Sequence, residues 1–235
     1  MRLDDEQESS NVEDRRGNRP MRAGGVGIGA IVLALAVSYF LGVDPSTVLN
    51  VVGQLDGQNG ETVEAHAPPA DDEKARFIAK VLGSTERTWQ DQFQQMGRQY
   101  EEPKLVLFTG ATPTACGTGQ TAMGPFYCPA DQKVYIDLAF YQELQDRFHA
   151  PGEFAQAYVI AHEVGHHVQN LLGISGQMRS AQRTARSEAE ANDLSVRLEL
   201  QADCLAGVWA AQANEARQIL ESGDVEQALA AASAI

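Results

Sequence analysis

The sequence predicts an α+β fold in which an N-terminal transmembrane helix precedes a mostly helical domain with a small β-sheet. Three observations support this. Residues 23–43 form an apolar stretch without charges, residues 105–108 and 133–137 are short runs rich in β-branched and aromatic side chains, and apolar residues after position 138 follow helical spacing. A few strands followed by several helices are typical of the α+β class. The 235 residues suffice for one domain with additional segments.

The stretch Ala23–Val43 has the length and composition of a helix that crosses a hydrocarbon core of about 30 Å. Arginines precede it and no Lys or Arg follows until Lys74, so the positive-inside rule predicts a cytoplasmic N-terminus and an extracytoplasmic domain at the cell membrane. A cleaved signal peptide is the alternative, but residues 39–43 lack a small-x-small cleavage site. The motif Gly25-x-x-x-Gly29 offers a helix-pairing face through which the chain can form a homo-oligomer.

The segments around this stretch set the domain boundaries. Residues 1–22 are polar and charged and predict a disordered cytoplasmic tail, whereas residues 44–72 have the Gly and Pro content of a linker. The folded domain is therefore expected at residues 73–235. Its helices are predicted at residues 73–100 with an interruption at Gly83 and Ser84, 138–148, 154–172 and about 181–220.

The chain is acidic, with 32 Asp and Glu against 18 Lys and Arg and a formal net charge of −14 at pH 7. A protein with this charge is repelled by the phosphate backbone of nucleic acid, so nucleic acid is not expected as a partner. Solubility is one explanation of the acidity, and attraction of basic substrates is the alternative.

Three cysteines fit an exported domain. Cys116 and Cys128 flank a Gly-rich segment that can fold back between the two predicted strands, so a disulfide is expected between them. A structural zinc site is the alternative, but neither residue belongs to a C-x-x-C pair. Cys204 lies in an apolar helical pattern and is expected to be a small buried residue.

The predicted helix 154–172 contains the pattern H-E-x-x-H. His162 and His166 lie one turn apart on the same face, so two neutral imidazoles can bind one zinc ion. Glu163 stands where a carboxylate accepts a proton from water in such sites. The flanking residues are apolar, so this helix is expected to be buried, and buried polar groups need partners. Gly165 allows another backbone or a substrate to approach closely.

A third zinc ligand is expected from the next helix. Glu199 and Asp203 lie one turn apart in its least polar part, an unusual setting for two carboxylates. Glu199 is predicted to bind zinc, and Asp203 to accept a hydrogen bond from His162. The rivals for the ligand role are Glu188 and Glu190.

Four other polar side chains, described next, are not expected to bind the metal. His167 points about 100° away from His166 around the helix and is expected to pack or hydrogen-bond locally. His149, Tyr135 and Tyr158 are candidates for a group that assists the reaction as an electrophile. No regular spacing relates them to the H-E-x-x-H pattern.

The chain resembles the bacterial neutral zinc metallopeptidase-like proteins, which are single-pass membrane proteins. The resemblance extends over nearly the whole chain, through residues 8–17, 82–89, 102–108, 115–117, 124–129, 162–169 and 199–207. It implies a zincin-like domain that binds Zn²⁺. Members of this family continue past the segment equivalent to Ala231–Ile235, so a truncated C-terminus is expected.

Together these patterns predict a membrane-anchored zinc metallopeptidase that hydrolyses peptide or protein substrates. Zinc is expected on His162, His166 and Glu199, with Glu163 as general base. The strand at 133–137 is the expected sheet edge that aligns substrate. The alternatives are a membrane-tethered zinc-binding or scaffolding protein without turnover, and a structural domain without metal.

Overall fold

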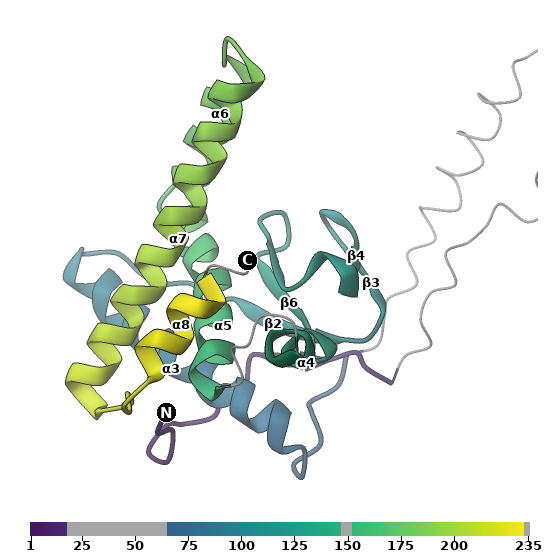
Figure 1. Ribbon diagram of the computed structural model, residues 1–235, viewed down its shortest axis with the longest axis vertical. Coiled ribbons are helices and arrows are strands. Elements are labelled where there is room, and N and C mark those ends of the chain that lie inside the picture. The colour runs from purple at the N-terminus through teal and green to yellow at the C-terminus, as the bar shows by residue number, and fades with distance from the viewer. Residues whose placement is uncertain (18–64, 147–151, 233–235) are drawn as a thin grey trace, which may run out of the picture. The chain divides into compact units, whose positions relative to one another are not determined.

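The computed structural model describes residues 1–17, 65–146 and 152–232 (Figure 1). Residues 1–17 belong to the same compact unit as the chain from Ala65 onward. Its larger sheet has the strand order β1-β2-β6-β5, in which β5 is antiparallel to β6 and the other pairs are parallel. The strands are β1 (Val12–Asp14), β2 (Lys104–Phe108), β5 (Phe126–Cys128) and β6 (Lys133–Asp137). Between β2 and β5 the chain forms the hairpin β3 (Ala111–Thr114) and β4 (Gly117–Gln120), followed by the 3-10 helix η1 (Thr121–Met123).

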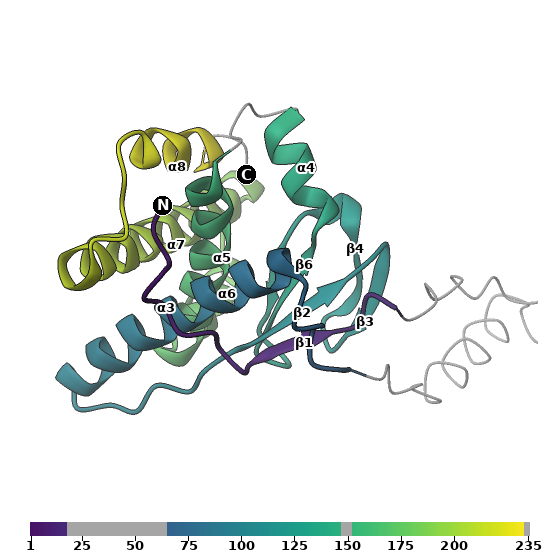
Figure 2. The same cartoon turned by 90° about the horizontal axis from the view of Figure 1, so that it is seen from below.

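The helices are α3 (Glu73–Gln95), α4 (Ala139–Asp146), α5 (Glu153–Leu171), α6 (Ile174–Arg183), α7 (Glu188–Arg217) and α8 (Asp224–Ala232). Helix α5 lies between the sheet and α7 (Figures 1 and 2). It also packs against α3, α6 and α8. Because neighbours surround it, almost every residue from Phe154 to Val168 is buried, which agrees with the apolar character of its sequence.

The two predicted strands are confirmed, and they pair with each other in parallel as β2 and β6. Their side chains alternate between two apolar clusters, as expected for a sheet covered on both faces. Leu105 and Ile136 join the main core with the helices, whereas Val106 and Tyr135 join a smaller cluster with Cys128. Burial on both faces explains why these strands are nearly continuous apolar runs.

The prediction that residues 133–137 form the free sheet edge is wrong. Strand β6 is paired on both sides, with β2 and with β5, so its backbone groups are used within the sheet. The strand at that edge is β5, which packs against α5. A three-residue strand inside a loop rich in Gly and Pro has no alternating pattern that would have revealed it.

The predicted fold class, with an N-terminal transmembrane helix ahead of an α+β domain, is wrong, and the observed fold is mixed α/β. None of the helices in residues 1–17, 65–146 and 152–232 is long and apolar enough to cross a membrane. The stretch 23–43, with its glycine motif, lies outside the described residues.

The predicted localisation, with a cytoplasmic N-terminus and an extracytoplasmic domain, is also wrong. Val12 of β1 is in register with Leu105 of β2, and Asp14 with Leu107. Two segments of one sheet cannot lie on opposite sides of a membrane, because the strands are hydrogen-bonded to each other.

The first 17 residues are ordered, contrary to the disordered tail expected there. The buried carboxylate of Glu6 forms an ion pair with Arg217 at 2.6 Å. Helix α3 is continuous through Gly83, where a Cβ atom would collide with the carbonyl oxygen of Gln7. The glycine therefore permits a close backbone contact and does not break the helix.

The long helical region predicted at about 181–220 is divided into two helices. Helix α6 ends at Arg183, and α7 begins after Ser187, whose side chain accepts a hydrogen bond from the backbone N–H of Glu190 at 3.1 Å. This N-cap sets where α7 begins. The interruption allows α6 to fold back against α7, as Figure 1 shows.

Candidate metal centre

Helix α5 places two imidazoles beside one carboxylate of α7. The rings of His162 and His166 have centroids 4.8 Å apart. The Nε2 atom of His162 lies 3.3 Å from Oε2 of Glu199, and Nε2 of His166 lies 3.1 Å from the same oxygen. One potential ligand atom from each of the three residues falls within 4.8 Å of the other two. The structure thus brings together the three residues that the sequence predicts as zinc ligands.

A close helix crossing brings Glu199 to the histidines. A Cβ atom on Gly165 would lie 2.9 Å from the carbonyl oxygen of Ala202 and 3.2 Å from its Cα. Helices α5 and α7 therefore touch through their backbones at this point, between the two histidines on one helix and between Glu199 and Asp203 on the other. A larger residue in place of Gly165 would push the two helices apart at this point.

Hydrogen bonds on the far side of each ring orient the histidines. Nδ1 of His162 lies 2.8 Å from Oδ1 of Asp203, and Nδ1 of His166 lies 2.9 Å from Oε1 of Gln169. The amide nitrogen of Gln169 donates to the carbonyl of Leu198 at 2.7 Å, so its oxygen is left to accept from His166. Both rings therefore donate through Nδ1 and present Nε2 to Glu199, the arrangement that a metal ligand requires.

The close approach of Glu199 to the two histidines shifts the pKa values of these side chains. Hydrogen bonds from His162 and His166 hold the pKa of Glu199 well below its usual range. Burial lowers the pKa of His166, but the hydrogen bond with Glu199 and the charge of Glu163 outweigh it and raise that pKa to about 9. The carboxylate of Glu199 thus favours positive charge on the two imidazoles that face it.

Glu163 is a buried acid beside this cluster, with only 7% of its surface exposed. Burial raises the pKa of its carboxyl above the usual value, and the two neighbouring histidines oppose that rise. The backbone of Tyr127 in β5 also forms a hydrogen bond that favours the charged form. Glu163 borders a cavity of about 580 Å³, together with His162, His166 and Glu199.

The alternative ligands Glu188 and Glu190, and the histidine next to His166, do not belong to this cluster. Glu188 and Glu190 are in the first turn of α7, where Glu190 accepts a hydrogen bond from the backbone N–H of Arg186 at 2.8 Å. His167 is fully buried. Its Nε2 donates to the carbonyl of Glu101 at 2.6 Å, so it hydrogen-bonds locally as expected.

The helper candidates differ in position. The hydroxyl of Tyr158 donates to Asp203, so it supports the carboxylate that orients His162. Tyr135 hydrogen-bonds with Asp131 in the smaller apolar cluster, away from the cavity, and His149 lies outside the described residues. Cys204 is exposed, contrary to the prediction, because it lies on the outer face of α7.

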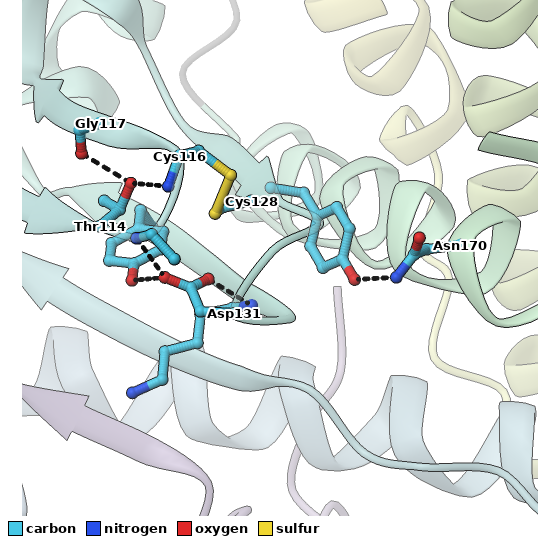
Figure 3. Close-up of a disulfide and its surroundings, with 10 residues drawn as sticks. Thr114, Cys116, Gly117, Cys128, Asp131 and Asn170 are labelled. Atoms are coloured by element: carbon cyan, nitrogen blue, oxygen red, sulfur yellow. Dashed lines mark hydrogen bonds between the residues drawn. A yellow bond between two sulfur atoms is a disulfide. The ribbon is translucent and has the colours of Figure 1, made fainter. Parts of the chain in front are cut away.

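The expected disulfide joins Cys116 in the β3–β4 turn to Cys128 at the end of β5 (Figure 3). Asp131 braces the same region, since its Oδ2 accepts from the backbone N–H of Ala115 at 3.0 Å and from the Tyr135 hydroxyl at 2.8 Å. Next to Cys128, Tyr127 connects the strand to α5. Together these contacts fix β5 beside the cavity.

Two residues that support the histidines were not predicted from the sequence. Gln169, which orients His166, lies three residues after it on the same face, so helical spacing could have identified it. The hydroxyl of Tyr127 lies 3.0 Å from Nδ1 of His167. It also accepts a hydrogen bond from the side-chain amide of Asn170 at 3.2 Å, which is the dashed line at Asn170 in Figure 3. No local spacing relates Tyr127 to these residues, because the fold alone brings β5 to α5.

Comparison with known proteins agrees with this geometry. A family model described as "Putative neutral zinc metallopeptidase" matches residues 1–235. The uncharacterized protein YpfJ of Escherichia coli (strain K12) is 47% identical over 245 residues, which cover 100% of this chain and 83% of the relative. The uncharacterized protein Rv2575 of Mycobacterium tuberculosis (strain ATCC 25618 / H37Rv) is 37% identical over 216 residues, which cover 84% of this chain and 69% of the relative. No solved structure matches significantly. The chain therefore belongs to the family that this model describes as "Putative neutral zinc metallopeptidase".

Proposed function

We propose that this protein is a zinc-dependent peptidase whose active site lies between α5 and α7. The observation that carries the proposal is the convergence of His162, His166 and Glu199, with a ligand atom of each within 4.8 Å of the others. Two imidazole nitrogens and one carboxylate form a ligand set of catalytic zinc sites, which leave a further position open.

The surroundings of these residues fit zinc. The Nδ1 hydrogen bonds with Asp203 and Gln169 leave both Nε2 atoms available, and the negative charge of Glu199 offsets part of a divalent charge. When bound, zinc supplies Lewis acidity that acidifies water and polarises a carbonyl group. The proton of that water is then transferred by residues of the chain itself.

Glu163 is the proposed general base. Its carboxylate adjoins the ligand His162 and borders the cavity, so it can take a proton from water there and pass it to the leaving amine. The raised pKa suits this role, because a carboxylate with a higher pKa is a stronger base.

Strand β5 is the proposed guide for the substrate backbone. It is the edge of the larger sheet, and Phe126 and Tyr127 line the cavity. A peptide that adds to this edge would gain backbone hydrogen bonds while its scissile carbonyl lies near Glu163.

The test is hydrolysis of a casein-like substrate by the purified chain, with and without a chelator and with zinc restored. We expect zinc to restore cleavage, and Glu163→Gln to retain zinc while kcat falls by about 10²-fold or more. Glu188→Gln, at the far end of α7, is the matched control and should keep full activity.

Two results would contradict the proposal. Zinc bound at one ion per chain without any hydrolysis would indicate a zinc-binding protein without turnover. Unchanged kcat in Glu163→Gln would remove the assigned base.

A further inference from the structure

One face of α6 forms a wall of the active-site cavity. Ser175, Met178, Arg179 and Gln182 all line it, and their spacing of three, four and seven residues is that of a single helical face. The side-chain amide of Gln182 donates to Ser195 of α7 at 2.8 Å, which holds α6 against the helix that carries Glu199. This face therefore has a fixed relation to the metal centre.

Arg179 is the one Arg or Lys among the described residues that line the cavity. Its guanidinium makes no ion pair with the described residues, although Glu143, Glu163 and Glu199 line the same cavity and the chain carries a net charge of −14. A cation left unpaired in so acidic a protein is available to an anion from outside.

We propose that Arg179 is a specificity-determining residue that binds a carboxylate of the substrate. The inference rests on the proposed peptidase function, because it assigns the carboxylate to a peptide that occupies the same cavity. A guanidinium fits a carboxylate through two parallel hydrogen bonds, which a lysine ammonium does not reproduce.

The carboxylate has two sources in a peptide, namely the C-terminus or an Asp or Glu side chain. The apolar residues of the cavity wall, which include Phe126, Phe140 and Met178, suit an uncharged side chain beside that anion. The contact forms equally in the bound substrate and in the transition state, so its loss raises KM and leaves kcat nearly unchanged.

The experiment uses the zinc-loaded full chain and three peptides of one neutral sequence. The first peptide has a free C-terminal carboxylate, the second is amidated, and the third is amidated and carries one internal Glu. For Arg179→Gln we expect KM to rise about three- to tenfold for one carboxylate-bearing peptide or for both, and to stay unchanged for the neutral amide. Arg179→Lys should recover part of the loss.

Arg183→Gln is the matched control, because it removes the same charge from the same helix one turn further on and outside the cavity lining. Selective loss for the free C-terminus identifies a terminal carboxylate, and selective loss for the internal Glu identifies a side chain. Equal loss for all three peptides, no loss, or the same loss in Arg183→Gln overturns the inference.

Calorimetry measures peptide binding to the Glu163→Gln chain with and without Arg179→Gln. It compares the same three peptides without turnover. A wild-type chain that cleaves none of the peptides would contradict the proposed function. The binding data would still decide whether Arg179 discriminates carboxylates, so the two failures are distinguishable.

Discussion

Asp203 contacts one of the three candidate ligands, His162, without being a candidate ligand itself. Its carboxylate accepts from Nδ1 of His162 and from the hydroxyl of Tyr158, and both contacts hold the imidazole with Nε2 toward Glu199. The apolar context of α7 was enough to single out this carboxylate in the sequence. Its partner Tyr158 lies one turn before His162 on α5, so the hydroxyl and the ring approach it from the same helix.

Replacement of Asp203 by Asn should weaken zinc binding about 10- to 100-fold, the usual effect of losing a carboxylate behind a ligand histidine. Competition with a chromophoric chelator measures this affinity. Asp193→Asn is the control, because Asp193 lies on the same helix and is exposed, and it forms its ion pair with the exposed Arg197. Equal affinities for the two variants would contradict the orienting role of Asp203.

The pKa of His166 predicts how zinc binding depends on pH. In the metal-free protein the pKa is raised to about 9, so a proton occupies the ring at neutral pH and competes with zinc. Apparent affinity should therefore rise as pH increases toward 9. The same raised pKa stabilises the metal-free fold below the usual histidine pKa, and that contribution is lost as pH rises through 9.

Titration of the histidine resonances by NMR measures this pKa directly. Glu199→Gln should move the pKa of His166 down, because the hydrogen bond and charge that raise it are removed. A wild-type value near 6.5, unchanged in Glu199→Gln, would contradict the arrangement of the two side chains.

At the scale of elements, the contact between α5 and α7 decides whether the site exists. Gly165→Ala should lower the free energy of unfolding by about 1–3 kcal/mol, because the added Cβ meets the Ala202 backbone at 2.9 Å. Helix propensity alone would give a gain of about 1 kcal/mol, so the sign of the change reports the close approach. Denaturant unfolding measures it.

Gly207→Ala is the matched control on α7, where a Cβ would meet nothing within 4 Å. It should stabilise the protein by about 1 kcal/mol. If both alanine variants stabilise the protein, the helices do not touch at Gly165.

The elements also show what local sequence patterns can predict. The strands β2 and β6 and the helix α5 were predictable because each is buried. Burial requires a continuous or regularly spaced series of apolar residues in the sequence. The three-residue strands β1 and β5 were not, since a strand that short has no period and exists only through its partner. The wrong choice of edge strand followed from missing β5.

At the scale of the whole molecule, the N-terminal segment does not lie where the sequence predicted, apart from the folded domain. Residues 1–17 look disordered by composition, yet β1 pairs with β2 and Glu6 forms an ion pair with Arg217 at the end of α7. Composition reports the average polarity of a segment and not the partners that it meets after folding. The candidate site was predictable to a greater extent. Its residues lie four apart, as His162 with His166 and Glu199 with Asp203, and this is the spacing of one helical face.

The most direct test of the central claim is X-ray absorption spectroscopy of the zinc-loaded chain, together with its zinc content. We predict about one zinc per chain, bound only by nitrogen and oxygen with two imidazoles, and loss of one imidazole in His166→Ala. Sulfur in the coordination shell, or an unchanged spectrum in His166→Ala, would contradict a metal centre formed by His162, His166 and Glu199.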